Sequence, residues 1–233
     1  GSPDNIYTRY RFKYLNNISF GITAEKDVGE NFFSNKRAEN LFNINTNRGF
    51  DFYSAHFYLK NVGKIKALAL GDYHIQLGQG LTFWSGLAFG KSSDIMGIKR
   101  NAIGIRPYSS VDENIFLRGA AAELKWKNLN FLAFGSKKSI DANLEMDSTS
   151  TDGDVTVTSF QSSGTHSTIG ELEDKDAIEE TIFGGEISIS NKNYTLGIVS
   201  AVSNYQGTIN RTLLPHSQFQ FNSIFNWVTG AHY

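Results

Sequence analysis

Residues 6–14, IYTRYRFKY, alternate between two kinds of side chain over nine positions. The even positions from Ile6 to Tyr14 are apolar or aromatic apart from one threonine, and the odd positions carry Tyr7 and three basic residues. A period of two residues predicts a β-strand whose two faces meet different surroundings. Similar strand-like segments occur at residues 18–25, 50–60, 65–73, 115–127, 129–138, 183–190, 194–202 and 219–227. The sequence therefore predicts an all-β chain.

The connections between these segments fall into two classes. Four are tight, at residues 16–17, 61–64, 127–128 and 191–193, and four are long, at residues 26–48, 85–100, 144–180 and 204–218. Short turns at one end and long loops at the other are typical of outer-membrane barrels. We therefore predict an antiparallel transmembrane β-barrel as a single domain over residues 1–233. Alternation gives about nine to eleven strands, whereas single-chain bacterial barrels normally close with an even number, so an incomplete barrel is also consistent.

The composition agrees with a barrel but does not require one. No apolar run approaches the length of a transmembrane helix, and no signal segment is recognisable at the start. Cysteine is absent, which excludes a disulfide framework and a thiolate zinc site. Aromatic residues make up 13% of the chain, and 22 residues are glycine. A soluble β-sandwich or a lipocalin-like barrel would share much of this composition and stays the alternative fold.

Two further features suit a barrel wall. Large aromatic residues gather near strand ends, as expected of rings at the membrane interface, and the candidates are Tyr10, Trp84, Trp126 and Trp227. Residues 70–86 contain four glycines, which permit sharp bends or close backbone approach, namely Gly71, Gly78, Gly80 and Gly86. We expect a glycine-bent strand pair there, a loop folded into the lumen, or a plain barrel corner.

Charge is distributed unevenly along the chain. Residues 142–180 contain ten acidic residues and one lysine, a net of −9, and are rich in Ser and Thr, so we expect a long, mobile surface loop. Because the whole chain carries −1, the remainder carries +8. Basic candidates for the lumen are Arg9, Arg11, Lys13, Arg106 and Arg118. They either favour anions in the lumen or pair across it with Asp51, Glu25, Glu123 and Glu186.

No catalytic constellation stands out. The GQG stretch lacks the Gly-Lys-Ser/Thr of a phosphate loop, and there is no Gly-x-Ser-x-Gly elbow. None of the five histidines lies at metal-ligand spacing on one element. Asp72, His74 and Ser85 form an imaginable hydrolytic set, which is better explained as an unrelated polar trio. The acidic stretch 147–154, DSTSTDGD, departs from the spacing of an EF-hand loop, so a solvated loop is the better interpretation.

Several stretches together resemble a family of large Bacteroidota outer-membrane proteins described as helix-hairpin-helix-domain-containing. The resemblance covers most of residues 5–143, and its most specific block is GDYHIQLGQGLTFWSG at residues 71–86; the other blocks are residues 23–33, 49–57, 103–121 and 136–143. It implies that the chain is the barrel portion of such a protein. The family's name comes from an upstream module related to competence proteins. That module is not visible here, so nucleic-acid binding does not transfer to these residues.

The expected function is that of an outer-membrane scaffold or conduit, with a link to DNA uptake only through the family. The expected partners are outer-membrane lipid and other envelope proteins, with no small-molecule cofactor and no metal. Two other functions stay open: a soluble β-barrel that binds an apolar ligand, and an outer-membrane hydrolase that depends on His74 or Ser85. The first would fold without detergent, and the second would lose activity on substitution of either residue.

Overall fold

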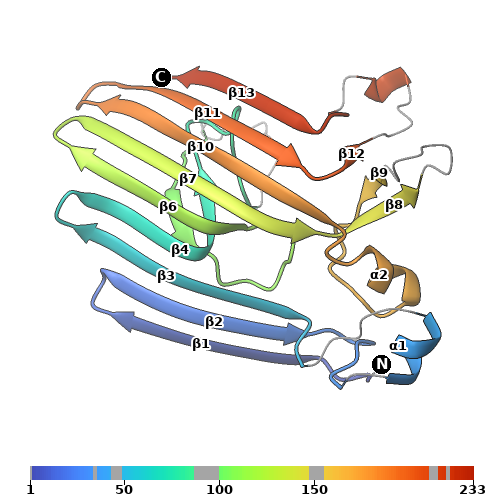
Figure 1. Ribbon diagram of the computed structural model, residues 1–233. Helices are drawn as coiled ribbons and strands as arrows, with labels where there is room; N and C mark the ends of the chain where they lie inside the picture. Colours follow the sequence, from blue (N-terminus) through green and yellow to red (C-terminus); the bar gives the residue numbers. More distant parts are fainter. Residues whose placement is uncertain are drawn as a thin grey trace.

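A computed structural model of the chain describes residues 2–33, 36–42, 49–86, 100–146, 155–209, 215–218 and 221–233. It is mostly β, with one large antiparallel sheet of ten strands and a small sheet of three (Figure 1). No helix in these ranges is long and apolar enough to cross a membrane. The predicted all-β, antiparallel class is confirmed at this level.

The large sheet follows the chain as a meander. Its path is β1 (Ile6–Tyr14), β2 (Ile18–Lys26), β3 (Phe52–Val62), β4 (Ile65–Gln76), β6 (Leu117–Trp126), β7 (Leu129–Ile140), β10 (Ile178–Ser190), β11 (Thr195–Tyr205) and β13 (Phe225–His232), and β5 (Gly104–Pro107) pairs with β4 off this path. The edge strands β1 and β13 run in the same direction and lie at opposite sides of the sheet (Figure 1). Among the described residues, neither edge strand has a second neighbour.

The tight turns all lie at one end of this sheet (Figure 1). They join β1 to β2, β3 to β4, β6 to β7 and β10 to β11, at the positions that the sequence predicted. Left-handed backbone at Leu15, Asn61 and Lys127 makes these turns possible, with φ near 49°, 55° and 56°. The first of these differs from expectation, because Leu15 rather than the following asparagines takes the positive φ. The helices α1 (Lys36–Phe42) and α2 (Ile169–Asp174) lie at the opposite end.

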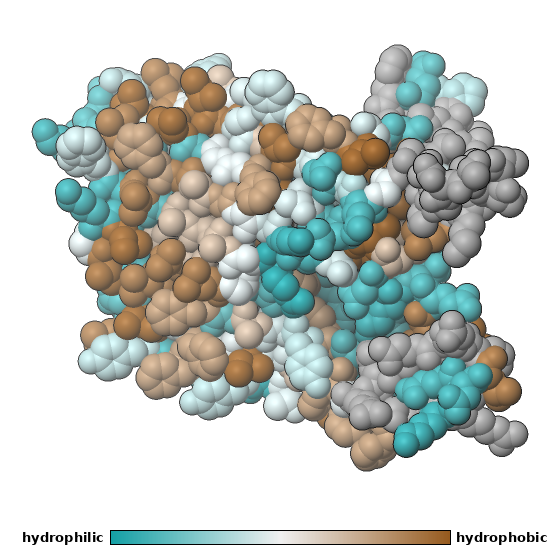
Figure 2. Space-filling view, in the orientation of Figure 1, coloured by the Kyte–Doolittle hydropathy of each residue, from teal (hydrophilic) through white to brown (hydrophobic). Residues whose placement is uncertain are grey.

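One face of the sheet, here called the open face, is apolar from edge to edge. A single row of paired residues crosses eight of its ladders: Phe12, Phe20, Phe57, Leu70, Ala120, Gly135, Phe183, Val202 and Trp227. Its large side chains are exposed, up to 67% for Trp227. Figure 2 shows apolar residues spread over the strands on this face, with polar residues concentrated towards the loop end. Alternation therefore places the aromatic side of each strand outward.

The opposite face, here called the covered face, carries the main core. Residues 72–116, as far as they are described, pack onto it, and the core cluster comprises Ala67, Ala69, Tyr73, Ile75, Leu77, Ile105, Leu117, Ala121, Leu132, Phe134, Ile182, Val199 and Ala201. Many of these residues are small, which leaves room for a segment laid across the strands. Burying them stabilises the fold at about 25 cal/mol per Å² of apolar surface.

Gly71 is the point at which β4 leaves β3, although β4 stays paired with β6 as far as Tyr73. Up to this residue β4 pairs with β3, and beyond it β4 pairs with β5 on the covered face. Gly71 has φ 90°, and a Cβ there would overlap the Ala55 carbonyl oxygen. Only glycine fits such a conformation and approach without strain. The Tyr73 hydroxyl then donates hydrogen bonds to the Gly135 and Ala120 carbonyl oxygens, at 2.7 and 3.2 Å, which fixes the departing strand to the sheet.

The departure of β4 leaves a gap between β3 and β6, which an ion pair fills. Arg118 Nε donates to Asp72 Oδ1 at 2.7 Å. The Ala55 N–H donates to Asp72 Oδ2 at 3.1 Å, and Arg118 donates to the Tyr53 carbonyl oxygen at 2.8 Å. The two side chains thus satisfy backbone groups that a straight β4 would have paired, as buried peptide groups require.

Residues 142–180 differ from the predicted mobile loop. Their described part forms β8 (Ala142–Met146), β9 (Val155–Phe160), α2 and the start of β10, and β9 also pairs with β12 (Thr208–Ile209). Ala142 and Val157 are fully buried in a second small core. The acidic, Ser- and Thr-rich composition led to a wrong prediction. A few apolar residues at alternating positions are enough to form a strand when another strand covers them. The stretch 147–154 lies outside the described residues.

The last strand also differs from expectation. Alternation predicted it at residues 219–227, whereas β13 spans Phe225–His232. Phe221 packs instead against the second core, next to Tyr205 at 5.8 Å between ring centroids. The apolar side chain of Phe221 therefore belongs to that small core and not to the large sheet. A short 3-10 turn, η2 (Pro215–Ser217), precedes it.

Candidate functional site

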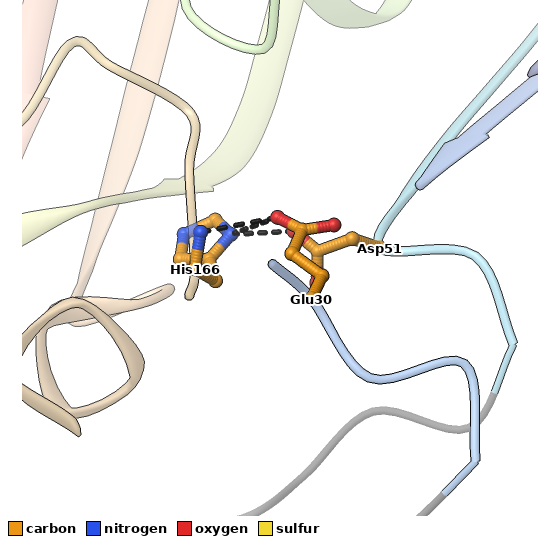
Figure 3. A group of neighbouring side chains, drawn as sticks. All are labelled: Glu30, Asp51 and His166. Carbon is orange, nitrogen blue, oxygen red and sulfur yellow. Dashed lines mark hydrogen bonds and ion pairs between the residues drawn. The ribbon is translucent and has the colours of Figure 1, made fainter. Parts of the chain in front are cut away.

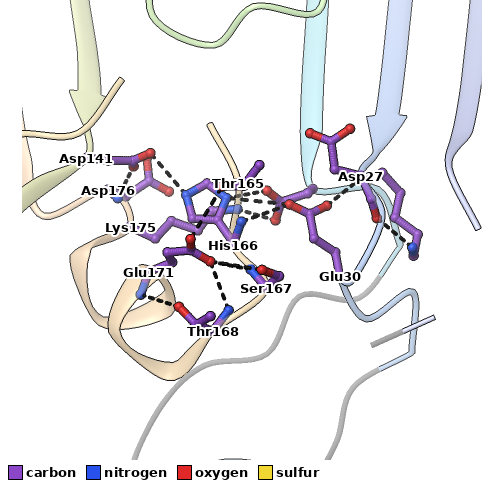
Figure 4. A network of polar contacts seen from close by, with 12 residues as sticks. Asp27, Glu30, Asp141, Thr165, His166, Ser167, Thr168, Glu171, Lys175 and Asp176 are labelled. Atoms are coloured by element: carbon purple, nitrogen blue, oxygen red, sulfur yellow. Dashed lines mark hydrogen bonds and ion pairs between the residues drawn. The ribbon is translucent and has the colours of Figure 1, made fainter. Parts of the chain in front are cut away.

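The most elaborate polar site is a buried cluster around His166 at the loop end of the sheet. Figures 3 and 4 show side chains from separate loops converging on the imidazole. Glu30 follows β2, Asp51 precedes β3, Glu113 precedes β6, Asp141 follows β7 and Lys175 follows α2. We call these six residues, Glu30, Asp51, Glu113, Asp141, His166 and Lys175, the loop-end cluster.

Local sequence places His166 in this position. Thr168 caps α2 in a reciprocal capping box with Glu171, the hydroxyl accepting from the Glu171 N–H and the Glu171 carboxylate accepting from the Thr168 N–H. The same carboxylate accepts from the Ser167 N–H at 2.9 Å. These bonds fix the backbone next to His166. The His166 N–H itself donates to Glu30 Oε1 at 3.0 Å.

The imidazole of His166 contacts a carboxylate through each ring nitrogen. Nδ1 lies 2.5 Å from Asp51 Oδ2, and Nε2 lies 3.0 Å from Asp141 Oδ2. Lys175 Nζ donates to the other oxygen of Asp51. The Asp176 N–H donates to Asp141 Oδ1 at 2.8 Å. With carboxylates on both sides, the ring is held as an imidazolium that donates two charge-assisted hydrogen bonds.

The electrostatics follow from this geometry. Burial alone would lower the pKa of His166, but its hydrogen bonds to Asp141 and Asp51 raise the pKa to about 10. Burial alone would raise the pKa of Asp51, but hydrogen bonds from His166 and Lys175 lower it to about 2. For Glu113, burial and the nearby charge of Asp51 outweigh the charges of His166 and Lys175 and raise the pKa to about 8. The cluster is therefore a set of opposite charges with one carboxyl group that holds its proton near neutral pH.

The cluster contains two sets of potential metal ligands. Ligand atoms of Glu30, Asp51 and His166 lie within 4.8 Å of one another, and so do those of Glu113, Asp141 and His166. A metal ion in either set would have to displace the proton from one ring nitrogen, because neutral imidazole is the ligand. The other ring nitrogen could keep its hydrogen bond to a carboxylate, as metal-bound histidines usually do. As it stands, the arrangement is an ion-pair network that joins loops.

The predicted basic residues separate into two groups. Arg118 is engaged with Asp72 in the gap of the sheet. Arg9, Arg11 and Lys13 lie on the covered face of β1, and Arg106 is exposed on β5. The predicted acidic partners have other contacts: Asp51 binds His166 and Lys175, Glu123 binds Lys66 at 2.6 Å and Glu186 binds His232 at 3.2 Å. The predicted cross-lumen pairs are thus replaced by different pairs.

The four glycines of residues 70–86 all have a positive φ. The values for Gly71, Gly78, Gly80 and Gly86 lie between 54° and 90°. Beyond Gly71 the chain crosses the covered face as a hairpin, since Ser85 N–H donates to the Ile75 carbonyl oxygen at 2.8 Å and Phe83 packs on Phe134. This geometry corresponds to the folded-in loop among the three alternatives.

Three of the four interfacial aromatic candidates, Tyr10, Trp126 and Trp227, are exposed on the open face. The prediction for Trp84 is wrong in position. It lies in the folded-in hairpin, bridged to Gln76, with the Arg100 guanidinium 5.7 Å from its ring. The reason is the bend at Gly71, which carries the hairpin of residues 72–86 onto the covered face.

The imagined hydrolytic trio does not form a relay. Ser85 Oγ accepts from the Ile75 N–H at 2.6 Å and lies 3.1 Å from the Ile75 carbonyl oxygen, so it closes the hairpin. Asp72 is bound to Arg118. Neither contacts His74, whose Nδ1 is buried without a hydrogen-bond partner among the described residues.

Sequence inspection missed the loop-end cluster. Its members come from four connections between strands, β2–β3, β5–β6, β7–β8 and β9–β10, with sequence separations such as 115 residues between Asp51 and His166. No local spacing can reveal such a site. Comparisons with family models, with curated proteins and with solved structures gave no match to this chain.

Proposed function

We propose that this chain forms an outer-membrane β-barrel, or the larger part of one, that serves as a scaffold or conduit in the envelope of a Gram-negative bacterium. The observation that carries the proposal is the open face. Apolar side chains cross it from β1 to β13, and many are large and exposed, including Phe12, Phe183 and Trp227. A contiguous apolar surface of this extent on a folded protein requires a cover, and hydrocarbon provides one.

Three further observations support the proposal. Many charged residues of the strands point to the covered face, among them Arg9, Glu123 and Glu186, as in a barrel whose interior is polar. The tight turns lie at one end, and the folded loops with the loop-end cluster lie at the other. The described parts of residues 72–116 pack onto the covered face, next to a polar cavity of about 300 Å³ at the turn end. This filling favours a scaffold or a gated conduit over a wide pore. A link to DNA uptake rests on the family resemblance alone.

A soluble protein that binds an apolar ligand is the second candidate. An apolar hollow of about 870 Å³ lies over β10, β11 and β13 and would accept an acyl chain or a comparable ligand. That function predicts a protein that stays in solution without detergent. The barrel predicts recovery in the membrane fraction and a compact band on a denaturing gel that shifts on boiling. Recovery as a soluble monomer, with no band shift, would reject the barrel and make the apolar hollow the site to study.

A further inference from the structure

The row of basic side chains on β1 is a charged surface that the scaffold function does not use. Arg9, Arg11 and Lys13 alternate along the covered face of β1, and every residue of this strand is exposed. Alternate residues of a strand lie about 6.6 Å apart, so the three charges form a line about 13 Å long. We call Arg9, Arg11 and Lys13 the basic strip.

The carboxylates of the covered face are not bound to this strip. Glu25 lies on the neighbouring strand opposite Tyr7, and it forms no ion pair with Arg9 among the described residues. Asp72, Glu123 and Glu186 pair instead with Arg118, Lys66 and His232. Among the described residues, no ion pair involves a member of the basic strip. The strip therefore retains its charge for a further partner.

Neutral contacts orient the two arginines without cancelling their charge. Arg11 donates to the Ser109 hydroxyl at 3.0 Å, and the Arg9 guanidinium lies 5.0 Å from the ring centre of Tyr7. Arg106 is a further exposed cation on β5, the strand that pairs with β4 on the covered face. Positioned guanidinium groups with remaining N–H donors suit bidentate contacts to phosphate oxygens.

We propose that the basic strip binds a linear phosphate-bearing polyanion that lies along β1, with Arg106 as a further cation on the same face. The charges are in line rather than convergent, so they match an extended anion with repeated charges better than a single compact anion. This inference rests on the proposed function, because it makes the covered face of the barrel the surface along which such an anion is held or passed.

The test uses a short, fluorescently labelled linear inorganic polyphosphate and the full chain folded in a zwitterionic detergent. Binding is followed by anisotropy at several salt concentrations. The variant R9Q/R11Q/K13Q is compared with K64Q/K125Q/K192Q, which removes the same charge from three exposed lysines near the tight turns. The strip variant should bind at least about tenfold more weakly, with a salt slope smaller by about two to three, and the control should change less than about twofold.

Three results would overturn the inference: unaltered binding in the strip variant, an equal loss in the control, or displacement of the probe by orthophosphate at the same phosphate concentration. The last would indicate a site for a single anion. The same samples are checked for the band shift on boiling. A shifted band with no polyphosphate binding rejects the strip alone, whereas absence of the shift rejects the barrel proposal itself.

Discussion

Two buried ion-pair sites join the β1–β3 part of the chain to the rest, and they are built differently. In the gap of the sheet, Asp72 and Arg118 stand in for backbone hydrogen bonds next to the bend at Gly71. At the loop end, His166 connects Asp51 and Asp141 from distant loops. The first site depends on a strand that the local sequence forces to bend, and the second only on side chains that meet after folding. Strand geometry should therefore tolerate less change than the loop-end cluster.

The bend at Gly71 should give the largest effect. In Gly71→Ala the new Cβ overlaps the Ala55 carbonyl oxygen at a φ of 90° that alanine disfavours. We expect a loss of about 3 kcal/mol or more in the free energy of unfolding, measured by urea titration of the detergent-folded protein. Gly170→Ala is the matched control, because a Cβ there meets nothing within 4 Å and helix α2 gains propensity. Equal stability of the two variants would contradict the role assigned to Gly71.

Removing Asp72 should rank second. Asp72→Ala leaves the Ala55 N–H and the Arg118 guanidinium without their acceptor. Breaking a buried pair costs about 3–5 kcal/mol, and the lower end applies here because the Arg118 side chain is 46% exposed. The control is Lys137→Ala, which breaks the exposed pair with Glu179 and should cost about 0–1 kcal/mol in the same titration. A similar cost for both variants would show that the gap is not held by the ion pair.

The loop-end cluster should respond more weakly and more locally. His166→Gln loses at least one charge-assisted hydrogen bond, so we expect a cost of about 1.5–3 kcal/mol. Amide exchange should accelerate in residues 141–146 and 164–176, while β2 and β6 stay protected. His216→Gln, at an exposed position in η2, is the matched control. Uniform acceleration across the sheet would mean that the cluster supports the whole fold rather than the loops.

The pH dependence separates the two sites, because only the loop-end cluster contains a histidine. His166 has a folded pKa of about 10, above its ordinary 6.5, so its stabilisation is complete below pH 6.5 and is lost as pH rises through 10. Glu113, raised to about 8, adds to the loss between pH 4.5 and 8 because its ionisation is disfavoured in the fold. The unfolding midpoint should therefore fall from pH 6.5 to 10 in the wild type and less in His166→Gln. Parallel profiles would contradict the imidazolium assignment.

The sequence predicts the strands and turns of this fold well and its buried polar sites poorly. Alternation is a local property, so the four tight turns and the strands β1 to β4, β6, β7, β10 and β11 could be located from it, whereas the short strands β5, β8 and β9 could not. The gap in the sheet could not, because the glycines of residues 70–86 indicate a bend but not which face the chain then follows. For the same reason, the sequence predicted the wrong position for Trp84. The loop-end cluster combines residues from four connections between strands, and no periodicity links Glu30 or Asp51 to His166.

The central claim, that the open face meets lipid, can be tested most directly on two adjacent residues of β10. Ile187 is 58% exposed on the open face, and Ser188 is 6% exposed on the covered face. The chain has no cysteine, so Ile187→Cys and Ser188→Cys each give a single labelling site for a fluorophore. In vesicles, a nitroxide on the lipid chains should quench the label at 187 strongly and that at 188 weakly. Quenching of the label at 187 by a water-soluble quencher, with none from the lipid nitroxide, would contradict the account.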